Sequence, residues 1–308
     1  MRYRVGLALV MVLSLVLSGC FGFLKPDKEL AKLELNAAKN MIEPGDANTL
    51  TVDGKAEDDS TVAVELTADA WKLVTEGAGK LEAKADNPNQ AVFTAAEDFT
   101  GDVKVEVKLN DLNADVTFKV VVTEVKGVKA GDLKEQDGYQ DSPNKDDHNG
   151  VRIVEDDQRG YAPGTVFTHW NWPGHWIKWE IEDVKAGEYA LVLRYATSSA
   201  EEFTKRTLKV NGEEVRGADN PIELPTTGGF AGGGAVGDWS YQVVPGIKIE
   251  QDGKVELILT HAGTPGERKG TNLAYLALVS PAEFPIDDSF LLRIEKAIGV
   301  ERTEGMWD

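Results

Sequence analysis

Residues 176–196 have the sequence WIKWEIEDVKAGEYALVLRYA, in which two alternating runs are joined by a short turn. Successive side chains of a β-strand point to opposite faces, so Ile177, Trp179 and Ile181 share one face, which we expect in the core. The same period of two places the large side chains of Tyr189, Leu191, Leu193 and Tyr195 on one face of the second run. The stretch therefore predicts two adjacent β-strands with a buried, aromatic-rich face.

More strands follow on either side of this pair. RTLKVNG, SYQVV, KVELILTH and LAYLALV are short runs of the same kind, and VNG before EEV is typical of a hairpin turn. No amphipathic segment of helix length separates them, which favours antiparallel sheets over a parallel α/β fold. We expect residues 126–282 to form a β-jelly roll of two sheets.

An earlier segment, residues 29–125, is also predicted to consist of strands alone. It holds alternating runs such as TLTVDG and DVKVEVKL, with polar turns between them. Short strands at this spacing predict an antiparallel sandwich. The pattern resembles bacterial immunoglobulin-like domains, and because no cluster of ligand-binding residues stands out in it, we expect this domain to act as a spacer.

The last segment, residues 283–308, differs from the strands before it. DDSFLLRIEKAIG begins with Asp, carries Phe290, Leu291, Ile294 and Ile298 at helical spacing, and ends with Gly299. The sequence therefore predicts one short capped helix that docks on the jelly roll, so that the whole chain is all-β apart from this tail.

The N-terminus has the features of an export signal. Arg2 and Arg4 precede an apolar run that ends in LSGC, so residues 1–19 are predicted to be a signal peptide. LSGC resembles the bacterial lipobox, in which the Cys becomes the lipidated first residue of the mature chain. This predicts a lipid on Cys20, a tether over residues 20–28, and an extracytoplasmic lipoprotein anchored to a membrane of the bacterial cell envelope. A cleaved signal without lipid is the alternative.

Composition limits the partners and the redox chemistry. The 308 residues include 33 basic and 52 acidic side chains, for a net charge of −19, which argues against nucleic acid as a partner because its phosphates would be repelled. Such a charge favours neutral or cationic ligands. Cys20 is the only cysteine, so no disulfide can form within the chain.

Four of the seven tryptophans stand in HWNWPGHWIKWE, residues 169–180. Trp176 and Trp179 fall within the predicted strand and are expected to be structural. Trp170 and Trp172 precede a Pro-Gly turn pair, so we expect them in a loop, and an exposed loop Trp is typical of a ligand contact.

Four phrases occur in order in the second domain: YQDSPNKDDHNGVRIVEDD, PGHWIKWEIEDVKAGEYALVLRYATS, LPTTGGFAGGGAVGDWSYQVV and TNLAYLALV. Together they resemble the family 6 carbohydrate-binding modules, with the related family 35 as the alternative. The resemblance covers about half of the chain and implies a jelly roll that binds polysaccharide or oligosaccharide in a cleft at its loop tips.

The resemblance also implies the residues of that cleft. One aromatic corresponds to Trp170 or Trp172, the second to Phe230, and a hydrogen-bonding amide to Asn272. The family usually has Trp where this chain has Phe230, which predicts less stacking area. Tyr161 and His169, which lie close to these positions in the sequence, are further candidates. A flat aromatic covers the C–H face of a sugar ring, and an amide can both donate to and accept from its hydroxyls.

The family has a structural calcium, and the positions that would hold it have changed here. The first strand has AGD where the family has AE, and Ala274 stands where an Asp is frequent. Asp132 and Glu135 remain as candidate calcium ligands. No cofactor is otherwise expected.

Catalytic motifs were not found. The sequence holds no G-x-S-x-G, H-E-x-x-H or P-loop, and the match of residues 232–237 to G-x-G-x-x-G neither follows a strand nor opens a helix. We therefore expect a non-catalytic binding protein. The alternatives are a glycan-degrading enzyme that uses the same cleft and a structural envelope protein without a sugar ligand.

Overall fold

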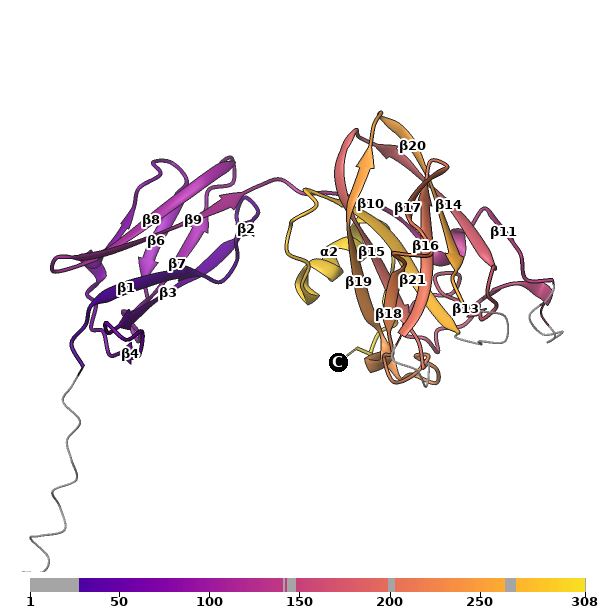
Figure 1. Cartoon of the computed structure of the whole chain (residues 1–308), viewed down its shortest axis with the longest axis horizontal. Coiled ribbons are helices and arrows are strands. Elements are labelled where there is room, and N and C mark those ends of the chain that lie inside the picture. The colour runs from indigo at the N-terminus through magenta and orange to yellow at the C-terminus, as the bar shows by residue number, and fades with distance from the viewer. Residues whose placement is uncertain (1–27, 141, 143–147, 199–202, 264–269, 308) are drawn as a thin grey trace, which may run out of the picture. The chain divides into compact units, whose positions relative to one another are not determined.

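A computed structural model describes residues 28–140, 142, 148–198, 203–263 and 270–307. The predicted signal peptide, Cys20 and most of the predicted tether lie outside the described residues. The chain divides into two compact units, Met1–Val120 and Val121–Asp308 (Figure 1). The predicted all-β class is confirmed in both.

The first unit is a sandwich of two sheets around one core. One sheet has the order β1 (Lys32–Ala37), β3 (Ala47–Lys55), β7 (Gln90–Ala95) and β6 (Gly79–Ala83), with β4 (Thr61–Val62) paired to β3. The other has the order β2 (Met41–Ile42), β9 (Leu112–Val120), β8 (Gly101–Leu109) and β5 (Trp71–Leu73). Phe93 of β7 meets Phe118 of β9 edge to face, with ring centroids 5.2 Å apart, so aromatic packing joins the two sheets.

The second unit is a larger sandwich of two antiparallel six-stranded sheets. The first sheet has the order β12 (Arg152–Ile153), β13 (Phe167–Trp170), β21 (Thr271–Ser280), β15 (Gly187–Ala196) and β19 (Ser240–Ile249), and β10 (Glu124–Lys129) also pairs with β21. The second sheet has the order β11 (Glu135–Asp137), β14 (Trp176–Val184), β20 (Gly253–His261), β16 (Phe203–Val210) and β17 (Glu213–Arg216), with β18 (Ile222–Pro225) paired to β16. This arrangement agrees with the predicted jelly roll.

Strand β10 fixes where the second unit begins. It pairs along its whole length with β21, from Glu124 opposite Ser280 to Lys129 opposite Tyr275. The two compact units meet between Val120 and Val121, five residues before the predicted boundary between residues 125 and 126.

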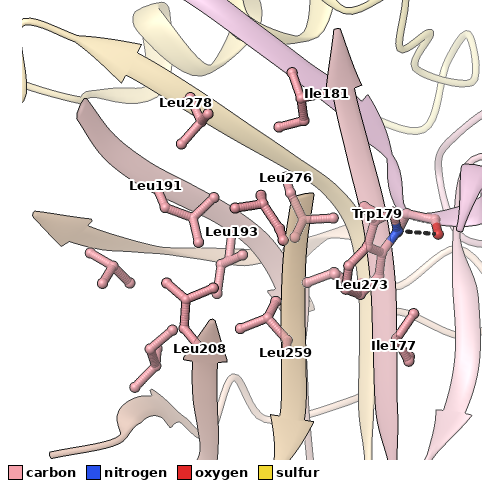
Figure 2. Packing of buried hydrophobic residues seen from close by; sticks show 14 of the residues in the cluster. Ile177, Trp179, Ile181, Leu191, Leu193, Leu208, Leu259, Leu273, Leu276 and Leu278 are labelled. Atoms are coloured by element: carbon pink, nitrogen blue, oxygen red, sulfur yellow. Dashed lines mark hydrogen bonds between the residues drawn. The ribbon is translucent and has the colours of Figure 1, made fainter. Parts of the chain in front are cut away.

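The core of the second unit lies between its two sheets. Ile177, Trp179 and Ile181 of β14 are buried there, as their alternation predicts, and meet Leu191 and Leu193 of β15 from the opposite sheet (Figure 2). The Trp179 indole donates from Nε1 to the carbonyl of Ala130, 3.0 Å away, so the polar atom of this buried ring is satisfied.

The C-terminal helix α2 (Asp288–Ala297) covers part of the outer face of the first sheet. Asp287 caps it by accepting from the backbone N–H of Phe290 at 2.9 Å, and Phe290, Leu291 and Ile294 are buried, as the helical spacing predicts. At Gly127 of β10, an added Cβ would lie 3.0 Å from a methyl carbon of Ile298, which shows how closely this end of the helix approaches the sheet.

The cover on the outer face of the first sheet explains why burial does not alternate along β15. Its residues Tyr189–Ala196 are buried without a break, and so are Thr271–Val279 of β21. A strand with only one covered face alternates in burial, whereas these central strands are covered on both faces.

Trp179→Ala should lower the free energy of unfolding of the second unit by about 3–5 kcal/mol, because it removes a large buried ring and leaves a cavity. Chemical denaturation followed by tryptophan fluorescence measures this unit, since every tryptophan except Trp71 belongs to it. Trp176→Ala, a half-buried ring in the same strand, is the matched control and should cost clearly less. Equal losses in the two variants would contradict the core assignment.

Candidate functional site

Phe230 presents an aromatic ring at one end of the second unit, in the segment between β18 and β19. It is 37% exposed, which few large apolar residues are in the part of the chain that the structure describes. Two side chains hold its backbone: Asn272 Nδ2 donates to the Phe230 carbonyl at 2.7 Å, and Arg159 Nη1 donates to the same oxygen. The exposed ring is therefore attached to a fixed backbone.

Gly270 brings an amide next to this ring. A Cβ at Gly270 would lie 2.5 Å from Asn171 Oδ1 and 3.4 Å from the ring of Phe230, so both side chains approach the bare backbone of this residue. The hydroxyl of Thr197 donates to the Gly270 carbonyl at 2.6 Å and fixes it. We call Asn171, Phe230, Gly270 and Asn272 the Phe230 cluster.

The side chain of Asp238 orders the backbone next to Phe230. Asp238 Oδ2 accepts from the backbone N–H of Ala231 at 3.0 Å, and Ala231 has a positive φ of 51°. At Gly229, an added Cβ would lie 1.9 Å from the same carboxylate oxygen, so a larger residue there would displace the Asp238 side chain. The ring of Phe230 is therefore preorganised, which lowers the entropic cost of binding a ligand.

The predicted loop position of Trp170 is wrong. Trp170 ends strand β13 and is 1% exposed, and its indole Nε1 donates to the carbonyl of His175 at 3.0 Å. The guanidinium carbon of Arg206 lies 4.1 Å from the centre of the ring. Trp170 is a core residue with a cation–π partner, and its face is not open to a ligand.

A bulge accounts for the inward turn of Trp170. Phe167 and Trp170 are both buried and both pair with β21, and the register shifts between them. Simple alternation would place residues three apart on opposite faces, but a bulge inserts one extra residue and restores the same face. His169, between them, has a positive φ of 68°, which supplies the local bend.

The buried charge of Arg206 depends on polar groups rather than on a described carboxylate. Its Nη2 donates to Thr271 Oγ1 at 2.7 Å, and its Nη1 donates to the backbone carbonyl of Lys205 at 2.8 Å. Complete burial lowers the pKa of Arg206 to about 9, because desolvation penalises the charged form. Arg206 thus belongs to the structural support below this end of the sheet.

Tyr161 is also not at the surface. It is buried, and its ring meets Trp239 and Trp307 edge to face at 5.3 and 5.2 Å. Its hydroxyl donates to Glu295 Oε1 at 3.0 Å. The candidate role of Tyr161 as a sugar contact is therefore corrected to one in packing and hydrogen bonding.

Asn272 lies next to Phe230, as the predicted site requires, but its amide nitrogen binds a backbone carbonyl of the protein. The residue is buried, and Nδ2 is used by the carbonyl of Phe230. Asn272 therefore positions the aromatic ring, and a direct contact of its Oδ1 with a ligand stays a prediction.

Trp172 and His169 remain candidates. Both are half-buried; Trp172 lies in the turn before β14, and His169 Nδ1 shares a hydrogen bond of 2.8 Å with Thr168 Oγ1. Among the ring contacts between described residues, none joins Trp172 to Phe230. The described contacts thus bring Phe230 and Asn272 together. A role for Trp172 as the second aromatic residue of the sugar site stays a prediction.

The two candidate calcium ligands do not form a donor set. Glu135 Oε2 pairs with Lys178 Nζ at 2.8 Å, and this bond raises the pKa of Lys178. Asp132 lies in a short 3₁₀ turn (Ala130–Asp132). In the described part of the chain, no group of three or more His, Cys, Asp or Glu side chains could hold a metal ion. Glu135 thus has Lys178 as its described partner, and the roles of Asp132 and Glu135 as calcium ligands stay a prediction.

Sequence reasoning missed three members of this region. Asn171 stands between the two tryptophans that it singled out, so its place in the loop was a usable signal. Nothing in the sequence marks Arg159 or Gly270, because each matters only through its contact with Phe230, which is distant from both in the sequence.

Comparison with known proteins gives likenesses to solved structures only. No protein-family model and no curated protein sequence matches the chain. The structures that it resembles include carbohydrate-binding modules of families 35 and 6, the two families that the sequence phrases resemble.

Three of these structures illustrate the likeness. A family 35 module from Clostridium thermocellum is 19% identical, with 51% of this chain and 98% of that chain covered and a TM-score of 0.36. A family 35 module from Cellvibrio japonicus is 17% identical, with 53% and 100% covered and a TM-score of 0.33. The C-terminal family 6 module of a laminarinase from Zobellia galactanivorans is 14% identical, with 50% and 98% covered and a TM-score of 0.34.

Trp170→Ala should destabilise the second unit by about 3–5 kcal/mol, the usual cost of deleting a buried aromatic ring, and also expose the Arg206 guanidinium. Trp172→Ala, two residues away and half-buried, is the control and should shift the thermal melting temperature much less. Equal melting temperatures for parent and Trp170→Ala would show that the ring is not part of the core.

Proposed function

We propose that the second unit is a non-catalytic carbohydrate-binding module that takes polysaccharide or oligosaccharide at the Phe230 cluster. The observation that carries this proposal is the half-exposed ring of Phe230, fixed through its backbone by Asn272 and placed beside the amide of Asn171. The ring would cover the C–H face of one sugar unit, and the neighbouring amide would bond its hydroxyls.

The charge of the chain supports a neutral ligand. At a net charge of −19, the protein as a whole repels polyanions, whereas an uncharged glycan is not affected. The Phe230 cluster contributes an aromatic ring, amides and backbone groups, and such groups bind hydroxyls but do not transfer protons at neutral pH. This supports binding without cleavage over the enzymatic alternative.

We further propose that the protein is a lipoprotein anchored through Cys20, in which the first unit is an immunoglobulin-like spacer. Support comes from the LSGC sequence and the basic and apolar segments before it. Within the described residues, no helix is long and apolar enough to cross a membrane. The proposed lipid on Cys20 would place sugar capture near a membrane of the bacterial envelope.

Phe230→Ala should weaken binding of the strongest glycan-array ligand roughly tenfold, because it removes the stacking face. Titration calorimetry measures the affinity, and thermal melting should change little, since the side chain is half-exposed. Leu292→Ala removes another exposed apolar side chain of the same unit and is the matched control, with parental affinity expected.

Three results would decide against this function. Parental affinity of Phe230→Ala would place the site elsewhere on the jelly roll. Release of reducing sugar from the bound glycan would favour the enzymatic alternative. Absence of any glycan ligand for the parent would favour the structural envelope protein.

Cys20→Ala should prevent lipidation and move the protein from the membrane fraction to the soluble fraction, or leave its signal peptide uncleaved. Fractionation and immunoblotting of expressing cells measure both effects, and Ser18→Ala, which keeps a small residue before the Cys, is the control. A Cys20→Ala protein that is processed normally and stays with the membrane would overturn the lipid anchor.

A further inference from the structure

A second recess lies away from the Phe230 cluster, between the first sheet of the second unit, helix α2 and the last residues of the chain. Its volume is about 580 Å³. Trp239, Leu292 and Trp307 supply apolar lining, and Arg194 and Arg302 supply two guanidinium groups. We call this recess the Arg194 pocket.

Arg194 is a buried cation without an acidic partner. It projects from β15, is 6% exposed, and donates from Nε to the Tyr161 hydroxyl at 3.2 Å. Its guanidinium carbon lies 5.5 Å from the centre of the Trp307 ring. Among the described residues, no carboxylate lies within ion-pair distance of it, and its side chain lines the pocket.

The nearby buried acid is already neutralised by another arginine. Glu295 accepts from Arg302 twice, at 2.6 Å from Nε and 3.2 Å from Nη2, and also accepts from the Tyr161 hydroxyl. Burial raises the pKa of Tyr161, so its hydroxyl stays neutral and does not offset a positive charge. This group therefore keeps one surplus positive charge, on Arg194. Asp288, the acidic residue that lines the pocket, is exposed, and water therefore screens its charge.

A buried charge is normally offset by a counter-charge or by hydrogen bonds, because taking it out of water is unfavourable. The chain has 52 acidic residues, but none of the described ones pairs with Arg194. The guanidinium instead lines an open recess. An arginine presents a planar fork of N–H donors that fits the two oxygens of a carboxylate.

We propose that the Arg194 pocket binds a ligand that carries a carboxylate on a ring. Arg194 would hold the carboxylate through its Nη donors, and Trp239, Leu292 and Trp307 would contact the ring. Two sources share this chemistry, an acidic sugar and an aromatic acid. The pocket uses no residue of the Phe230 cluster, so the proposal does not depend on the function proposed for that cluster.

The test uses titration calorimetry on the full chain with two matched pairs of probes. Sodium glucuronate is compared with glucose, and sodium benzoate with benzamide, so that each pair differs in the carboxylate. At least one acid should bind to the chain carrying Phe230→Ala, which lacks the stacking face of the Phe230 cluster. Its neutral analogue should not bind this variant, and added salt should weaken the binding of the acid. Which acid binds more tightly distinguishes the sugar source from the aromatic source.

Arg194→Gln should weaken binding of the acid roughly thirtyfold or more, because it removes the charged partner of a desolvated carboxylate. Arg194 is buried, so a thermal melt must show that the variant folds. Leu292→Trp, which narrows the pocket from its exposed rim, is the second variant and should also weaken the acid. Phe230→Ala should bind the acid like the parent.

Several outcomes overturn the proposal. These are the absence of heat with both acids at millimolar concentration, equal binding of acid and neutral analogue, and parental binding by folded Arg194→Gln or by Leu292→Trp. Binding that appears only after Asp308→Asn also overturns it, since the protein's own acid would then be the ligand of Arg194. None of these results would affect glycan binding at the Phe230 cluster, which is measured separately.

Discussion

The central strand β21 is the element on which the second unit depends. It pairs with β15 on one side and with both β10 and β13 on the other, and its residues Thr271–Val279 are buried. One face meets the core between the sheets, and the other is covered near α2 and the chain end. A strand enclosed in this way has no freedom of register, because a shift of one residue would exchange all its side chains between two filled layers.

That fixed register positions both candidate sites. At the beginning of β21, Gly270 and Asn272 hold the ring of Phe230 and the amide of Asn171 next to each other. Further along, β21 pairs with Arg194 of β15 through Tyr275, on the side where Tyr161 and Glu295 are buried. Because a rigid strand carries the polar groups of each site, their relative positions are fixed. A preorganised binding site requires such fixed positions.

The outer cover formed by the C-terminal segment changes the chemistry of the sheet below it. Without Glu295, Arg302 and Trp307, the side chains of Tyr161 and Arg194 would face water and would be ordinary surface groups. Under that cover they form a buried hydrogen-bonded group with an open recess beside it. The short helix α2 thus helps to form the Arg194 pocket, which shares no residue with the Phe230 cluster.

Much of this architecture follows from the sequence. Alternation identified Ile177, Trp179 and Ile181 as core, and the acidic cap with helical spacing identified α2, because both patterns reflect local backbone geometry. Phe230 and Asn272 were found through ordered phrases rather than through geometry. The roles of Trp170, Tyr161 and Arg194 were decided by the tertiary structure alone. A bulge in β13 turns Trp170 inward, and a chain segment more than one hundred residues away closes over Tyr161. Burial depends on what packs from elsewhere in the chain, and a local pattern does not contain that information.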